Sequence, residues 1–146
     1  MKISIVCVGK IKEKFFTDAI LEYSKRLSKY CNLEIVEVAD EKTPDNASLH
    51  EEELIKDKEG DRILKNIGDR DYVIALAIEG KQLSSPEMAN MVEKLSVDGI
   101  SSIAFVIGGS LGLSSKVLSR ADYKLSFSSM TFPHQLMRVI LLEVFE

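Results

Sequence analysis

The sequence has few of the residues that hold metal ions or cross-link a chain. It contains two cysteines and two histidines among 146 residues. Cys7 and Cys31 lack the spacing of a metal-binding pair, and we interpret neither His50 nor His134 as a metal ligand. We therefore expect both thiols to be reduced and no metal centre to form.

Long hydrophobic runs are also absent. No apolar stretch approaches the roughly 20 residues that a helix needs to cross a bilayer. No leader with a charged start, an apolar middle and a small-residue cleavage site opens the chain. The sequence therefore does not predict a membrane or secreted protein, and we interpret it as cytoplasmic.

Internal repeats, low-complexity segments and linkers are not found either. Hydrophobic residues make up 45% of the chain and charged residues 29%, which is typical of a globular protein. A chain of 146 residues is long enough for one core. We expect a single domain spanning residues 1–146.

Acidic residues slightly outnumber basic ones, and the basic ones are concentrated near the start. The net charge is −4, yet residues 1–30 carry a net charge of +4 and residues 31–71 one of −7. A protein with one basic face can dock a polyanion despite an acidic average. A solvated helix surface would have the same composition, so both interpretations stay open. The basic residues in question are Lys10, Lys12, Lys25, Arg26 and Lys29.

The sequence does contain a regular alternation of strand and helix patterns. Apolar helical spacing begins at Phe16, an S-x-x-E capping box at Ser48 starts a second helix, and Ser85–Pro86 starts a third. A short helix at residues 114–120 and a last helix opened by Pro133 follow. This order predicts an α/β fold, a mostly parallel sheet with helices on both faces. The expected strands are Ile3–Val8, Leu33–Val38, Tyr72–Ile78, Ile103–Ile107 and Tyr123–Phe127.

Glycines and small polar residues follow the last two predicted strands. Gly108, Gly109 and Gly112 predict a tight turn, where missing side chains allow a close approach of backbone. Residues 128–132 form a polar loop after the last strand. We expect the two strands to be neighbours, and α/β sheets bind ligands at their carboxyl ends. The pattern favours a site for a flat ring with polar edges.

The same glycine turn fits two other kinds of site less well. Its G-x-S-x-G pattern would make Ser110 a hydrolase nucleophile, with His134 as base and Asp122 as the residue that orients it. The chain is short for that fold, and no second oxyanion loop is visible. Dinucleotide binding is not favoured, because no G-x-G-x-x-G follows the first strand.

Several segments together carry a family resemblance. They are V-G-K at Val8–Lys10, D-K-E-G-x-R-I-L at 57–64, L-x-I-x-G-K at 76–81, V-I-G-G-S-x-G-L at 106–113 and L-S-F-S-x-M-T-F-P-H-Q-x-M-R-V at 125–139. With these segments the chain closely resembles, from end to end, the ribosomal RNA large subunit methyltransferase H family of the SPOUT methyltransferases.

The resemblance implies an activity, a cofactor and partners. Members of the family are homodimers that use S-adenosylmethionine to methylate N3 of a pseudouridine in 23S rRNA of the large ribosomal subunit. The resemblance also implies a trefoil knot in the C-terminal half of the chain, a rare exception to unknotted topology. It implies neither a metal nor a membrane.

Carried over residue by residue, the resemblance places the cofactor pocket at two single residues and one loop. Leu76 and Phe127 would wall a slot for adenine, and Gly108 would admit a close approach. Core packing is the alternative role for Leu76 and Phe127, and turn geometry is the alternative for Gly108. The loop residues implied are Phe127, Ser128, Ser129, Met130, Thr131 and Phe132.

Two residues of the last predicted helix are the candidate catalytic residues. His134 and Arg138 lie four positions apart and so share a helix face. We expect His134 near the target base and Arg138 on a phosphate or on the uracil oxygens. The alternatives are a capping or core role for His134 and a structural ion pair for Arg138.

The sequence departs from the family pattern at its C-terminal end. The family continues into a tail with aromatic, basic and histidine residues, whereas this sequence ends at Val144-Phe145-Glu146. We expect the chain as given to fold, dimerise and bind S-adenosylmethionine, with any loss confined to methyl transfer. A non-catalytic module that binds the cofactor or docks on a ribosome is the alternative function.

Overall fold

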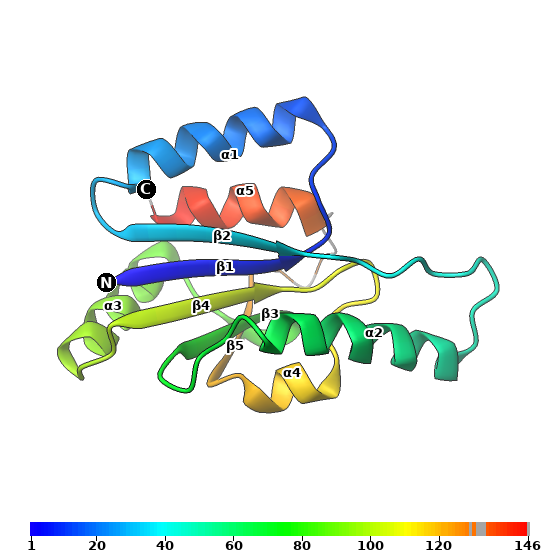
Figure 1. The fold of residues 1–146 in the computed structure, drawn as a ribbon. Helices are drawn as coiled ribbons and strands as arrows, with labels where there is room; N and C mark the ends of the chain where they lie inside the picture. The colour runs from blue at the N-terminus through cyan, green and yellow to red at the C-terminus, as the bar shows by residue number, and fades with distance from the viewer. Residues whose placement is uncertain (129, 131–133, 146) are drawn as a thin grey trace.

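The computed structural model describes residues 1–128, 130 and 134–145 of the chain, and Figure 1 shows its ribbon. Strands and helices alternate along the described chain, as predicted. Their bounds are β1 Lys2–Val8, α1 Lys14–Leu27, β2 Asn32–Val38, α2 Leu49–Leu64, β3 Tyr72–Gln82, α3 Ser85–Val97, β4 Ser102–Ile107, α4 Ser115–Arg120, β5 Tyr123–Ser126 and α5 His134–Phe145.

The strands form one sheet in the order β2-β1-β4-β3-β5, and every pairing is parallel. The expected α/β class is therefore confirmed. The expectation that the strands now called β4 and β5 are neighbours is wrong, because β3 lies between them. Their carboxyl ends nevertheless reach the same edge of the sheet, since parallel strands all end there.

Helices cover both faces of the sheet. The connections from β1 to β2 and from β3 to β4 run in one direction and carry α1 and α3 on the face that α5 also covers. The connections from β2 to β3 and from β4 to β5 run the other way and carry α2 and α4 on the opposite face. Right-handed crossovers require this change of face with each change of direction.

The central strands bury side chains on both faces, which explains their continuous apolar runs. In β4, Ile103, Phe105 and Ile107 pack with α1, α3 and α5, while Ala104 and Val106 pack with α2 and α4. Cys7 points into the first of these layers, where burial raises the pKa of its thiol to about 11. This cysteine is therefore a core residue and a poor nucleophile at neutral pH.

Helix starts follow the serine signals of the sequence. Ser48 and Glu51 form the predicted capping box, with the Ser48 hydroxyl accepting from the Glu51 amide at 3.1 Å. The third helix was expected to be capped by Ser85, but its N-cap is Ser84, which forms a capping box with Glu87. Only Ser84 has a glutamate three positions later, and this second contact decides the start of the helix.

Two further features bear on the possible sites. No helix in the part of the chain that the structure describes is long and apolar enough to span a bilayer. Within the same residues, no group of three or more His, Cys, Asp or Glu side chains is placed to hold a metal ion.

Candidate functional site

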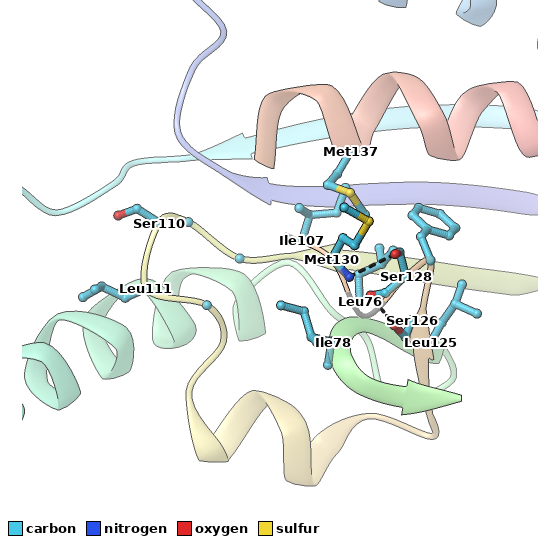
Figure 2. A pocket seen from close by; sticks show the side chains of 15 residues that line it. Leu76, Ile78, Ile107, Ser110, Leu111, Leu125, Ser126, Ser128, Met130 and Met137 are labelled. Atoms are coloured by element: carbon cyan, nitrogen blue, oxygen red, sulfur yellow. Dashed lines mark hydrogen bonds between the residues drawn. The ribbon is translucent and has the colours of Figure 1, made fainter. Parts of the chain in front are cut away.

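A cavity of about 730 Å³ opens at the carboxyl edge of the sheet. Its walls come from the ends of β3 and β4, from the residues after β5, and from Met137 of α5 (Figure 2). The cavity has the size of a typical small-molecule site. The described residues that line it are Leu76, Ala77, Ile78, Ile107, Gly108, Gly109, Ser110, Leu111, Gly112, Leu125, Ser126, Phe127, Ser128, Met130 and Met137.

The predicted pocket residues that the structure describes all lie at this cavity. Leu76, Gly108, Phe127, Ser128 and Met130 contribute to its lining. Ser129, Thr131 and Phe132 lie outside the described residues. Leu76 and Phe127 also pack against the core, so the two roles considered for them are compatible.

The glycine turn after β4 is held by contacts within itself. A Cβ atom at Gly108 would lie 2.7 Å from the carbonyl carbon of Gly112, and Gly112 has a φ of +89°. The Gly112 amide donates to the Gly109 carbonyl at 3.1 Å, which closes the turn. The turn therefore needs glycine at Gly108 for its own geometry, whether or not a ligand approaches.

Replacing Gly108 by Ala is therefore expected to lower stability as well as ligand affinity. The new Cβ must push the backbone of Gly112, so we expect a loss of about 1–3 kcal/mol in the free energy of unfolding. Denaturant unfolding measures it, and Gly68→Ala is the control, because a Cβ at Gly68 comes no closer than 3.6 Å to another atom and φ is positive at neither residue. Equal losses in the two variants would show that the close contact with Gly112 does not set the cost.

The end of β3 is distorted where it borders the cavity. Leu76 and Lys81 both align with Leu125 of β5, so residues 77–80 bulge out of the sheet between them. A Cβ atom at Gly80 would lie 2.7 Å from the Lys124 carbonyl, which explains the glycine. The predicted strand ended at Ile78 with a turn at Glu79–Gly80, whereas β3 continues to Gln82. This bulge at residues 77–80 places Ile78 at the cavity (Figure 2).

Two serines order the chain after β5. The Ser126 hydroxyl donates to the Ser128 carbonyl at 2.9 Å, and the Met130 amide donates to the Ser128 hydroxyl at 3.0 Å (Figure 2). These bonds link Ser126, Ser128 and Met130, which all line the cavity. Met130 from this segment and Met137 from α5 line the same cavity and supply flexible, polarisable walls.

Arg138 is buried, with 1% of its surface exposed. Its Nη1 donates to Glu37 Oε2 at 2.6 Å, and its Nη2 donates to the carbonyls of Val8 and Gly9 at 3.0 and 2.7 Å. Its Nε has no hydrogen-bond partner among the described residues. Contact between Arg138 and RNA stays a prediction, and it would require the guanidinium to exchange these partners. The side chain of His134 lies outside the described residues.

The geometry does not favour a hydrolase. Ser110 follows the carboxyl end of β4, whereas Asp122 precedes β5 at the opposite edge of the parallel sheet. The Asp122 carboxylate accepts from the Val73 amide at 2.8 Å. The Ser110 hydroxyl points away from the cavity in Figure 2. A hydrogen-bonded relay between Ser110 and Asp122 therefore does not form.

The basic residues near the start divide into two groups. Lys10 and Lys12 follow β1 at the carboxyl edge of the sheet, the edge at which the cavity opens. Lys25 and Lys29 lie at the other end of α1, which spans 14 residues and so about 20 Å. Arg26 is paired with Glu22 at 3.1 Å. The sequence placed these residues on one basic edge, and the fold separates them.

Some residues that line the cavity were not singled out from the sequence. Ile78 belongs to the L-x-I-x-G-K segment, and its position in that segment could have suggested it. Met137 likewise belongs to the segment at 125–139, but its place at the cavity depends on how α5 packs against the sheet.

Comparisons with known proteins identify the family of this chain. Residues 1–145 match a family described as predicted SPOUT methyltransferase. A ribosomal RNA large subunit methyltransferase H from Clostridium botulinum strain Hall is 68% identical over 98% of this chain and 90% of its own length. The protein of the same name from Clostridium beijerinckii is 63% identical over the same shares. The chain belongs to the ribosomal RNA large subunit methyltransferase H family of the SPOUT methyltransferases.

Proposed function

We propose that this protein is an S-adenosylmethionine-dependent methyltransferase that acts on N3 of a pseudouridine in 23S rRNA of the large ribosomal subunit. The family and the names of the relatives support methyl transfer to ribosomal RNA. One structural observation carries the proposal. Described residues of three segments of the family resemblance, at 76–81, 106–113 and 125–139, line one cavity although the segments are far apart in the sequence.

The cavity fits S-adenosylmethionine in its size and its walls. Its volume of about 730 Å³ accommodates a molecule of that class. Leu76, Ile78 and Phe127 offer apolar surface for a flat adenine, and the glycine turn offers backbone without side chains. Ser126 and Ser128 contribute polar atoms. When bound, the cofactor supplies an activated methyl group on a sulfonium.

The residues of the chain then act mainly by orientation. Walls that hold two reactants in line can lower a barrier by several kcal/mol, roughly 7–11 in the best cases. The target N3–H must also lose its proton. We assign to His134 a position near this N3–H. His134 begins α5 three residues before Met137 of the cavity wall, and the two residues are therefore about one helical turn apart.

The proposal includes a homodimer, which the family resemblance implies. The last helix supports it, because Leu141 and Leu142 are buried within the chain while Val139, Ile140 and Val144 are only half-buried. A second copy would cover such a surface. The knot of the family also belongs to the proposal, and the segment that would complete it includes residues outside the described part. Sedimentation at micromolar concentration tests the dimer.

The test of the function combines calorimetry with methyl transfer. We expect the protein to bind S-adenosylmethionine and to transfer tritiated methyl groups to ribosomes that lack the modification. Nucleoside analysis of the product should find 3-methylpseudouridine. Cofactor binding without transfer to any ribosomal substrate would instead identify a non-catalytic binding module. Transfer to another nucleoside would contradict the proposed target.

A further inference from the structure

The buried Arg138 joins the last helix to the first two strands. Its guanidinium touches the carbonyl oxygens of Val8 and Gly9, where β1 ends, and the carboxylate of Glu37 on β2. These groups are contributed by residues 101 to 130 positions earlier in the chain. A charge this deeply buried requires such partners, because an unpaired ion would be costly to desolvate.

Glu37 extends the link into the loop after β1. The same oxygen, Oε2, that accepts from Arg138 also accepts from the backbone amide of Ile11 at 3.1 Å. Ile11 lies between Lys10 and Lys12. Residues 9–13, here called the basic loop, are therefore held by Arg138 at Gly9 and by Glu37 at Ile11.

The other end of the link is the cavity. Met137 lines the cavity, and the next residue on the same helix is Arg138. Two adjacent side chains of α5 thus contact the cavity and hold the basic loop. The described helix is continuous through both positions, so their separation is fixed by helix geometry.

We propose that Arg138 and Glu37 position the basic loop relative to the cavity, so that Lys10 and Lys12 meet RNA phosphates while the target base reaches the cofactor. This inference rests on the proposed function. It makes Arg138 and Glu37 positioning residues that act through the loop. Their loss should therefore impair the use of RNA and leave cofactor affinity unchanged.

Two variants break the link. Glu37→Gln keeps the shape of the side chain and removes its charge. Since a lone buried Arg138 can unfold the protein, the second variant, Glu37→Leu with Arg138→Met, replaces both charges by apolar groups, an exchange that proteins often tolerate. Glu34→Gln is the matched control. Glu34 lies on the same strand, pairs with Lys2 at 3.4 Å near the other edge of the sheet, and is exposed.

The first readout needs no RNA. Hydrogen exchange of the Ile11 amide should be about 10-fold faster or more in the double variant, because its acceptor is gone, and unchanged in Glu34→Gln. The second readout is methyl transfer. We expect kcat/KM for ribosomes to fall by about 10-fold, chiefly through KM. The slope of RNA affinity against salt should flatten by up to about two units.

A double-mutant cycle separates positioning from general damage. In a Lys10→Ala/Lys12→Ala background, breaking the link should have no further effect on RNA affinity, because the lysines it positions are gone. Full additivity in folded variants would overturn the proposal, as would unchanged Ile11 exchange or an equal loss of cofactor affinity. If the unaltered protein methylates no RNA, the proposed function fails, and Ile11 exchange still shows whether the link holds the loop.

Discussion

Replacing Ile78 by Trp is expected to weaken S-adenosylmethionine binding by about 100-fold, or about 2.7 kcal/mol. Ile78 lies in the bulge of β3 at residues 77–80, lines the cavity, and is 54% exposed. A larger ring there occupies space that the ligand needs and displaces no core atom. The melting temperature should therefore stay close to that of the unaltered protein. Calorimetry measures the affinity.

Val97→Trp is the matched control for this substitution. Val97 is also a β-branched residue and 80% exposed, and it ends α3 away from the cavity. Its replacement adds the same ring to the surface without entering the site, so cofactor affinity should not change. If Ile78→Trp binds the cofactor as tightly as Val97→Trp does, the cofactor does not occupy this cavity.

Replacing Lys10 and Lys12 together by Ala is expected to weaken binding to ribosomes by about 10-fold or more at physiological salt. Each lost phosphate contact should flatten the slope of log affinity against log salt by about one unit. The two residues follow β1 at the edge where the cavity opens. Cofactor affinity should stay unchanged, because neither residue lines the cavity. Binding at several salt concentrations measures the effect.

The control for the lysine pair comes from the other end of α1. Lys25→Ala with Lys29→Ala removes the same charge from the opposite edge of the sheet. A purely long-range attraction would weaken equally in both double variants, since only net charge would matter. We expect the salt slope to change in the Lys10/Lys12 variant alone. An equal change in the two would show that RNA binding extends along the whole helix.

Local patterns in the sequence were sufficient for the elements of this fold. The apolar run at Ile103–Ile107 predicted a strand buried on both faces, and it packs in both layers of the core. The Ser48 capping box was confirmed. The same S-x-x-E rule, applied to Ser84 and Glu87, would have placed the start of α3 correctly. Such signals are readable because the interacting atoms lie within one helical turn or one strand.

The candidate site could be predicted from the sequence in part. The glycine turn and the segment after β5 do border one cavity, and the family segments name most of its walls. The need for glycine at position 108 could be predicted only in part, because its contact with Gly112 depends on how the turn folds back. The bulge at 77–80 could not be predicted from the sequence, since it depends on the alignment of β3 with β5.

By itself, the sequence determined the α/β class, the order of strands and helices along the chain, and the family. Only the tertiary structure placed β3 between β4 and β5, separated Lys10 and Lys12 from Lys25 and Lys29, and buried Arg138 against Glu37. The order of strands in the sheet and the ion pair of the buried Arg138 with Glu37, 101 positions earlier, depend on contacts that no local pattern records. They form only when the packing of the whole chain compensates for desolvation and for the entropy of closing long loops.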